Sequence, residues 1–286
     1  MNQFKKEARA TYILKAIEEL SLGGNSYHTL QDIKQKSRVR NPVNNTEFES
    51  DFDYLVQQAL LHQVWDQIYL METWQYETFV AKRIFEMTQE NENRPAFRLS
   101  RSIIVNGNLL TDEQRAAVSH ALSHPLSMIQ GGAGTGKTTI IEAIVSQFPG
   151  HTGYYLCAPT GKAARNLNER SNLSASTVYS TLGMTPDDNM LHTPPLEKVS
   201  MVIVDESSML TLKEFAGILE AAKSASKIVL IGDPDQLQAV GSGNIMPDLQ
   251  ELGIPTFRLT ACHRQVGEER ALLHNVRDFQ NCYTVS

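Results

Sequence analysis

The most constraining feature of this sequence is a glycine-rich segment that fits the pattern G-x-x-x-x-G-K-[ST]. Its residues are Gly131, Gly132, Ala133, Gly134, Thr135, Gly136, Lys137 and Thr138. An apolar run at 126–130 precedes the segment, and an apolar helical pattern through Ile140, Ile141 and Ile144 follows it. Glycines let backbone N–H groups converge on phosphate oxygens, and the helix directs its positive end to the same place. A phosphate-binding loop is therefore predicted; the flanking strand and helix disfavour the alternative, a glycine-rich turn that fits by chance.

From about residue 108, apolar strands alternate with helical patterns. The strands are expected at 126–130, 153–158, 201–204 and 227–231, and helices follow them from about residue 162 and around 212–222. Such alternation predicts an α/β fold, a parallel sheet with helices on both faces, which binds ligands at the carboxyl ends of its strands.

Residues 1–95 have a different character. Apolar residues recur at helical spacing near the N-terminus and again from residue 51. Residues 62–70 come next; they are rich in β-branched and aromatic residues and suit a strand. We expect a small, mainly helical module at 1–95, of winged-helix type, then a linker at 96–107 and a motor domain at 108–286. Trp65 and Trp74 are expected to pack in the core of the module, with stacking on bases as the alternative. Four alternating cations, Lys34, Lys36, Arg38 and Arg40, suit either a solvated face or phosphate contacts.

Composition narrows the class of protein. Of 286 residues, 41% are hydrophobic and 20% charged, which is a globular mix. No apolar run reaches the length of a membrane span and no signal-peptide core is present, so a cytoplasmic protein without a membrane partner is expected. The net charge of −6 counts against wrapping of duplex DNA but allows a narrow basic channel for a single strand.

Two adjacent carboxylates, Asp205 and Glu206, end the apolar strand expected at 201–204. Together with the Thr138 hydroxyl, Asp205 is placed to hold Mg²⁺, and Glu206 is placed to polarise an attacking water. An ordinary acidic pair at a strand end is the alternative, which the phosphate-binding loop upstream disfavours.

Four further segments go beyond a general nucleotide-binding domain. They are 110–114 (LTDEQ), 158–164 (APTGKAA), 230–243 (LIGDPDQLQAVGSG) and 259–265 (LTACHRQ). Together they resemble superfamily-one helicases, and within them the RecD-like branch, over about residues 108–266. The resemblance implies a RecA-like domain that uses ATP and Mg²⁺ and acts on single-stranded DNA.

The resemblance also implies roles for individual residues. Gln114 would contact the adenine, Gln236 would sense the γ phosphate, and Arg264 would stabilise charge in the transition state. The implied ATP site comprises Gln114, Gly131, Gly132, Ala133, Gly134, Thr135, Gly136, Lys137, Thr138 and Thr139. The implied catalytic set is Lys137, Asp205, Glu206, Gln236 and Arg264. The implied DNA contacts are Pro159, Thr160, Lys162, Tyr179 and Gly241. For Gln114 and Lys162 the alternative is a solvated position near a helix start, and for Arg264 it is a surface salt bridge.

Two departures from the family pattern affect this interpretation. Tyr179 stands where the family often has histidine, so it either stacks on a base or packs in the core. After Arg264 no segment matches the second RecA-like domain, so we expect the chain to be a fragment that holds half of the ATP cleft.

The resemblance thus implies an ATP-dependent DNA helicase of RecD-like type that travels 5′ to 3′ in recombination and repair, with other repair proteins as partners. For this chain alone we expect weak ATP hydrolysis and no unwinding. The alternative function is a nucleotide-binding module that docks on DNA or a partner protein without turnover. A GTPase switch is disfavoured because guanine-binding proteins lack the segment around Gln114, and a P-loop kinase is disfavoured because it would not need the 232–243 loop.

Overall fold

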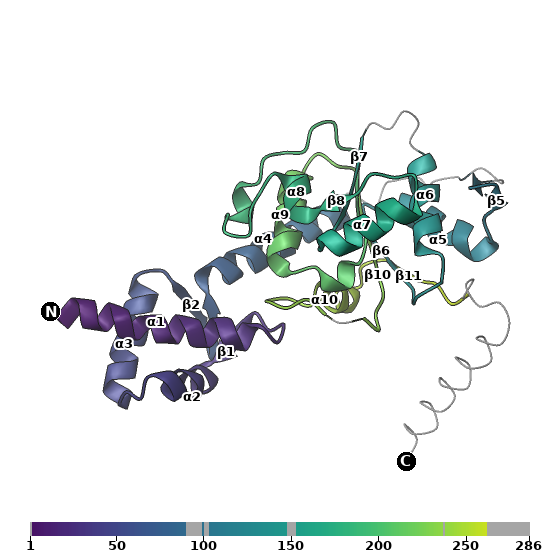
Figure 1. Cartoon of the computed structure of the whole chain (residues 1–286). Coiled ribbons are helices and arrows are strands. Elements are labelled where there is room, and N and C mark those ends of the chain that lie inside the picture. The colour runs from purple at the N-terminus through teal and green to yellow at the C-terminus, as the bar shows by residue number, and fades with distance from the viewer. Residues whose placement is uncertain (1, 90–98, 100–102, 148–152, 237, 262–286) are drawn as a thin grey trace, which may run out of the picture.

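In the computed structural model, residues 2–89, 99, 103–147, 153–236 and 238–261 are described. They fold into an N-terminal unit and a larger α/β domain, joined through a long helix (Figure 1). Of the linker expected at 96–107, residues 96–98 and 100–102 lie outside the described residues, and residues 104–105 form a short strand.

The N-terminal unit consists of three helices and a three-stranded antiparallel sheet with strand order β1-β3-β2. Its elements are α1 (Asn2–Ser21), β1 (Tyr27–Thr29), α2 (Leu30–Arg40), α3 (Asn45–Gln57), β2 (Leu61–Val64) and β3 (Gln67–Leu70). Their apolar faces meet in one cluster around Ile17, Ile33 and Phe48. Arg9 of α1 donates to both carboxylate oxygens of Asp51 of α3, at 2.8 and 3.0 Å, and so ties the two helices together.

The predicted strand at 62–70 is wrong in one respect, because it is two strands joined by a tight turn. Trp65 occupies that turn with φ +58° and is 92% exposed, so its expected place in the core is also wrong. Trp74 is half-buried and stacks on His62 with ring centroids 4.3 Å apart.

The α/β domain is built on six parallel strands in the order β11-β6-β10-β9-β7-β8. These strands are β6 (Leu126–Gln130), β7 (Tyr154–Ala158), β8 (Ser176–Thr177), β9 (Met201–Val204), β10 (Lys227–Gly232) and β11 (Thr256–Arg258). The helices are α5 (Asp112–Ser123), α6 (Lys137–Ser146), α7 (Gly161–Arg170), α8 (Val178–Leu182), α9 (Leu212–Ala221) and α10 (Ile245–Glu251). Short elements complete it: a hairpin of β4 (Ile104–Val105) and β5 (Asn108–Leu109), and 3-10 turns η1 (Met190–His192) and η2 (Ser207–Met209).

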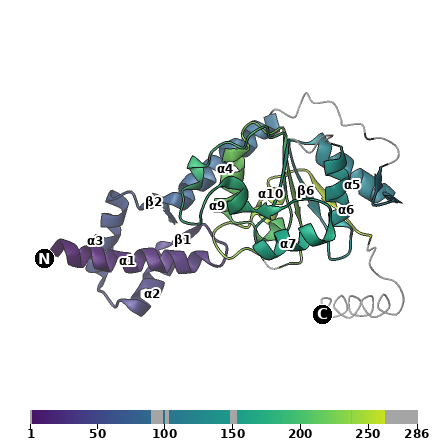
Figure 2. The same ribbon diagram turned by 45° about the horizontal axis from the view of Figure 1, so that its top comes forward.

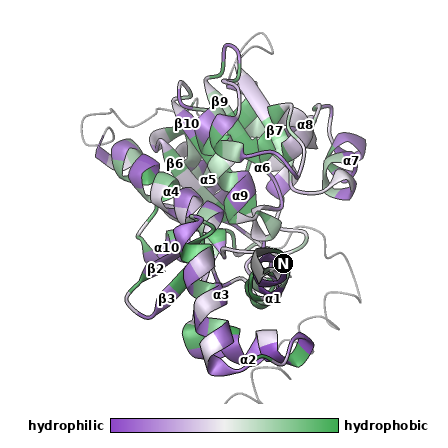
Figure 3. Ribbon diagram, turned by 90° about the vertical axis from the view of Figure 1, so that its left-hand side faces the viewer, coloured by the Kyte–Doolittle hydropathy of each residue, from purple (hydrophilic) through white to green (hydrophobic). Residues whose placement is uncertain are grey.

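Helices cover both faces of this sheet, which confirms the predicted fold class. Alternate residues of β10 enter different cores: Ile228 and Leu230 pack with α9 and α10, whereas Val229 and Ile231 pack with α5 and α6. Strands buried on both faces read as continuous apolar runs, and Figure 3 shows these hydrophobic strands between the helices.

Helix α4 (Met71–Gln89) links the two parts and packs on the α/β domain. Its residues Tyr76, Val80, Ile84 and Met87 are buried in the same cluster as α9, and the two helices lie side by side in Figure 2. The sequence grouped α4 with the module at 1–95; its apolar stripe faces the larger domain instead.

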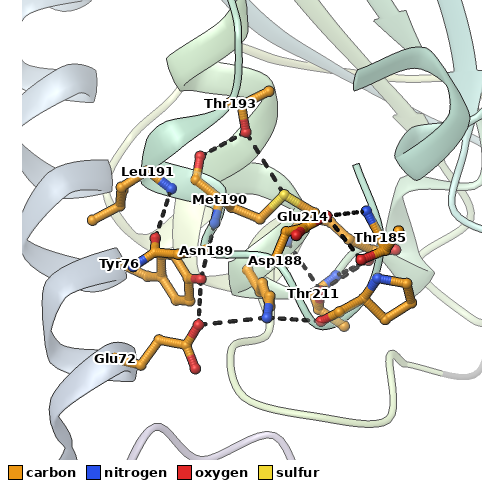
Figure 4. Close-up of polar contacts among 12 residues, drawn as sticks. Glu72, Tyr76, Thr185, Asp188, Asn189, Met190, Leu191, Thr193, Thr211 and Glu214 are labelled. Atoms are coloured by element: carbon orange, nitrogen blue, oxygen red, sulfur yellow. Dashed lines mark hydrogen bonds and ion pairs between the residues drawn. The ribbon is translucent and has the colours of Figure 1, made fainter. Parts of the chain in front are cut away.

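A polar contact strengthens this packing (Figure 4). The Tyr76 hydroxyl donates to Glu72 at 2.6 Å and accepts from the backbone N–H of Met190 at 3.2 Å. Lys213 of α9 donates to Glu72 at 3.4 Å. Among the described residues, no helix is both long enough and apolar enough to cross a bilayer.

Candidate functional site

The glycine-rich loop joins β6 to α6 at the carboxyl edge of the sheet, as predicted. Gly134 and Gly136 have φ values of +82° and +88°, a left-handed conformation that side chains rarely adopt. A Cβ on Gly131 would lie 2.5 Å from the Thr135 hydroxyl oxygen and 3.0 Å from Leu259. The loop therefore needs glycine for backbone conformation at two positions and for space at a third.

Lys137 is the first residue of α6, and its ammonium lies back across the loop. Its Nζ donates to the carbonyl oxygens of Gly131 at 2.6 Å and Gly132 at 3.3 Å. These contacts hold the positive charge of Lys137 against the glycine-rich loop.

The predicted carboxylate pair follows β9, the strand beside β10. Asp205 is 9% exposed, and burial, followed by the neighbouring Glu206, raises the pKa of its carboxyl to about 6. Glu206 has φ +53° and ψ +37°, a left-handed conformation that costs a non-glycine residue about 1–2 kcal/mol. Strain of this kind is concentrated at functional sites.

Both carboxylates keep an unused acceptor. Oδ1 of Asp205 and Oε2 of Glu206 are buried and accept no hydrogen bond from any residue in the described ranges. A buried carboxylate oxygen without a donor is costly, and a hard cation with its waters would satisfy it. These oxygens therefore fit a site for Mg²⁺, although no set of three His, Cys, Asp or Glu side chains forms a metal site within the described part of the chain.

The loop and the carboxylates line one cavity of about 370 Å³. Its lining residues are Gly132, Ala133, Gly134, Gly136, Lys137, Thr138, Thr139, Ala163, Asn166, Leu167, Arg170, Asp205, Glu206 and Gln236. The structure thus brings together most of the predicted phosphate-site residues and adds Gln236 from the loop after β10.

The sequence missed the wall that α7 provides. Asn166 and Arg170 line the cavity together with Ala163 and Leu167. Their spacing of three and four residues puts all four on one face of the helix, and this periodicity was the available signal.

Gln114 is buried, and it forms a capping box with Thr111. Its Oε1 accepts from the Thr111 N–H at 3.0 Å, and its own N–H donates to the Thr111 hydroxyl at 3.2 Å. The alternative of a solvated helix-start residue is therefore wrong. Gln114 is not among the residues lining the cavity, so its contact with adenine stays a prediction.

The residues predicted to touch DNA lie after three different strands. Pro159 and Thr160 follow β7, and Thr160 caps α7 by accepting from the Ala163 N–H at 3.2 Å. Lys162 is exposed on the first turn of that helix. Gly241, with φ +137°, lies in the loop after β10.

Tyr179 is half-buried on α8 and packs against the core cluster that contains α9. Burial raises the pKa of its hydroxyl to about 12, and Glu214 and Glu72 add to the shift. Part of the Tyr179 side chain therefore packs in the core, as the alternative expected. Its contact with single-stranded DNA stays a prediction. Arg264 lies outside the described residues.

Comparison with known proteins agrees with this geometry. The model of the family described as AAA domain matches residues 109–281, more than half of the chain. The RecD subunit of the RecBCD enzyme from Mycolicibacterium smegmatis is 35% identical over 167 residues, covering 49% of this chain and 30% of that protein. The ATP-dependent RecD2 DNA helicase of Deinococcus radiodurans is 37% identical over 164 residues, covering 56% of this chain and 22% of that protein.

Among solved structures, the Pif1 helicase from Candida albicans is similar with a TM-score of 0.45 and 23% identity, covering 61% of this chain and 44% of that one. The chain spans less than a third of the length of the two curated relatives above. The match to the family model spans the loop, the carboxylates and the sheet that carries them, and the chain belongs to the AAA domain family.

Proposed function

We propose that this chain is the first motor domain of an ATP-dependent DNA helicase of RecD-like type. The observation that carries the proposal is the single cavity in which the glycine loop, the two carboxylates with unused oxygens and Gln236 meet. The similarity to proteins named as RecD and RecD2 supports it.

In the proposed reaction, the Gly131–Thr138 loop and Lys137 hold the phosphates of ATP. The Thr138 hydroxyl and Asp205 would hold Mg²⁺, which neutralises charge on the phosphate oxygens when it is bound. Glu206 orients a water and accepts its proton as the water attacks the γ phosphate, and ADP with its new charge leaves. Gln236 and, from outside the described residues, Arg264 stabilise the developing negative charge.

The DNA side of the proposal uses the same edge of the sheet. Pro159, Thr160 and Lys162 begin α7, the helix whose inner face lines the ATP cavity. A single strand along this edge would therefore touch one side of α7 while the nucleotide touches the other. Tyr179 and Gly241 are proposed as further contacts along the strand.

We further propose that residues 2–70 form a winged-helix unit. The order helix, strand, helix, helix, strand, strand and the antiparallel sheet support this. Helix α3 carries Glu47, Glu49, Asp51 and Asp53 and no lysine or arginine, so phosphates would repel it. The basic residues of α2 already pair within the unit, for example Lys36 with Glu19 at 3.3 Å. The acidic side chains of α3 therefore disfavour its insertion into a groove of duplex DNA.

The names of the relatives suggest partners and setting. RecD is a subunit of the RecBCD enzyme in the first relative. We propose that the full protein acts with other recombination and repair proteins, and that it travels 5′ to 3′. A cytoplasmic location stays a prediction from the sequence.

The experiment that tests the proposal measures ATP hydrolysis with and without single-stranded DNA on this chain, on Glu206→Gln and on Glu197→Gln. Glu197 is an exposed carboxylate away from the cavity and serves as the matched control. We expect weak, DNA-stimulated hydrolysis that Glu206→Gln lowers at least a hundredfold, the scale of general-base catalysis, and that Glu197→Gln leaves unchanged. Hydrolysis that survives in Glu206→Gln would overturn the mechanism. ATP binding without any DNA-stimulated turnover would favour the non-hydrolysing binding module.

A further inference from the structure

The N-terminal unit touches the α/β domain at the loop that also enters the ATP cavity. This loop, here called the β10–α10 loop, spans residues 233–244, of which the structure describes all but 237. Near its start, Gln236 lines the cavity beside the carboxylates. In its middle, Val240 is 76% exposed.

The end of the loop is held by two backbone hydrogen bonds from different parts of the fold. The N–H of Gly243 donates to the carbonyl oxygen of Gly24 at 2.8 Å, and the N–H of Leu212 donates to the carbonyl oxygen of Ser242 at 3.0 Å. Gly24 lies in the turn between α1 and β1, and Leu212 is the first residue of α9. The loop is therefore anchored by the N-terminal unit on one side and by the α/β domain on the other.

The approach at Gly24 is too close for a side chain. Gly24 has φ +93°, and a Cβ there would lie 2.8 Å from Oδ1 and 2.9 Å from Nδ2 of Asn244. Oδ1 of Asn244 is buried and has no hydrogen-bond donor among the described residues. An added carbon at Gly24 would therefore push against the side-chain amide of Asn244, the residue that follows Gly243, whose N–H bonds to Gly24.

A second contact beside the first holds the turn in place. The Ser26 hydroxyl donates to Glu77 of α4, at very close range. Burial raises the pKa of Glu77, and Asp248 of α10 adds to the shift. Asp248 in turn accepts from the N–H of Asn244 at 3.2 Å. Ser26 thus ties the turn to α4, and Asp248 of α10 holds the N–H of Asn244 at the end of the loop.

We infer that Gly24 and Asn244 are positioning residues that fix the rear end of the β10–α10 loop, so that the N-terminal unit sets how tightly nucleotide turnover responds to DNA. A loop fixed at both ends has fewer conformations than one fixed at one end, so a displacement at its exposed middle is transmitted to Gln236. The inference rests on the proposed function, because it assigns a role to Gln236 and to the exposed part of the loop in the motor cycle.

The test compares two glycine-to-alanine variants of the whole chain. Gly24→Ala and Gly107→Ala both place alanine at a left-handed backbone position, with φ +93° and +80°. A Cβ at Gly107 meets nothing within 4 Å, whereas a Cβ at Gly24 meets Asn244. Gly107→Ala therefore controls for backbone strain, and only Gly24→Ala adds the steric contact.

Two measurements read the result. Amide hydrogen exchange of the segment 238–249 reports whether the loop end is released, without any need for catalysis. Steady-state hydrolysis reports the DNA concentration for half-maximal stimulation separately from the basal rate. For Gly24→Ala we expect exchange about tenfold faster and a half-saturating DNA concentration about tenfold higher, the factor that ~1.4 kcal/mol gives. The basal rate should stay within about twofold, and Gly107→Ala should change neither reading.

A second substitution separates the contact from a general folding defect. Asn244→Ala removes the side chain that the new Cβ would meet. In the double variant, Gly24→Ala with Asn244→Ala, the effects should be non-additive, and both readings should return toward those of Asn244→Ala alone.

Equal behaviour of Gly24→Ala and Gly107→Ala in both measurements would overturn the inference, as would simple additivity in the double variant. If the unaltered chain shows no DNA-stimulated hydrolysis, the proposed function fails, and the exchange measurement still decides whether the N-terminal unit anchors the loop.

Discussion

The carboxylate of Glu113 accepts hydrogen bonds from both the backbone N–H and the hydroxyl of Thr260, each at 2.7 Å. Its second oxygen accepts from the N–H of Ala261 at 3.1 Å. One side chain on the first turn of α5 therefore fixes the segment that follows β11. Because Gln114 is the next residue and Arg264 lies three residues beyond Ala261, this contact joins two of the family segments in space.

Glu113→Ala should destabilise the chain by about 0.5–1.5 kcal/mol, since it removes three hydrogen bonds whose donors lie near the surface and can turn to water. The measurement is the free energy of unfolding in urea. Asp112→Ala is the matched control, because the Asp112 side chain is 94% exposed and its loss should change stability by less than about 0.5 kcal/mol. Equal losses in the two variants would show that the Thr260 contact contributes nothing.

Asp205 should cost the nucleotide-free protein stability at neutral pH. Because burial raises its pKa from 3.8 to about 6, the folded chain binds a proton between these pH values that the unfolded chain has lost. The stability from this proton is fully present below pH 3.8 and is lost as pH rises through about 6. Asp205→Asn stays neutral, so it should stabilise the free protein by about 2–3 kcal/mol above pH 7.

The same variant gives its own internal control. Unfolding measured at successively lower pH should show the advantage of Asp205→Asn shrinking, because Asp205 itself becomes protonated in the folded state. With Mg²⁺ and ATP the order should reverse, since ligand binding stabilises only a chain that keeps the carboxylate. A constant advantage at all pH values would contradict the raised pKa.

The sequence could predict the sheet because its strands are buried on both faces. Runs such as Met201–Val204 therefore contain no polar residues. The polar residue that follows this run, Asp205, lies at the carboxyl edge of the sheet, where ligands bind. The same logic located the glycine loop, whose pattern and flanking elements are local in sequence.

What the sequence could not show depends on contacts between distant segments. Nothing local marks Glu113 as the partner of Thr260, or Gly24 as the neighbour of Asn244. Trp65 was assigned to the core from its residue type alone, whereas the tight turn between β2 and β3 puts it in solvent. The apolar stripe of α4 was visible, but the surface that it covers was not.

Tyr76→Phe should destabilise the chain by about 1–3 kcal/mol, because it leaves the buried N–H of Met190 without an acceptor. The loss should appear as a lower urea midpoint with an unchanged slope. The control is Tyr155→Phe, whose hydroxyl donates to the exposed carbonyl of Glu197 at 3.1 Å and can be replaced by water. If Tyr155→Phe costs as much as Tyr76→Phe, burial of the Met190 contact is not the cause.

Lys162→Ala should weaken binding of single-stranded DNA about threefold to tenfold and lower the salt dependence of the affinity. Each phosphate contact on a single strand contributes about 0.7 to the slope of log K against log salt, so the slope should fall by about that amount. Lys162 follows β7 at the carboxyl edge of the sheet, where single-stranded DNA is proposed to bind.

Lys223 provides the control. It precedes β10 at the opposite edge of the sheet and is also exposed, so Lys223→Ala should leave both affinity and slope unchanged. Fluorescence anisotropy of a labelled oligonucleotide, titrated at several salt concentrations, measures both quantities. A loss of affinity with an unchanged slope would mean that Lys162 acts by holding α7 in place. An unchanged affinity would mean that single-stranded DNA does not bind along this edge of the sheet.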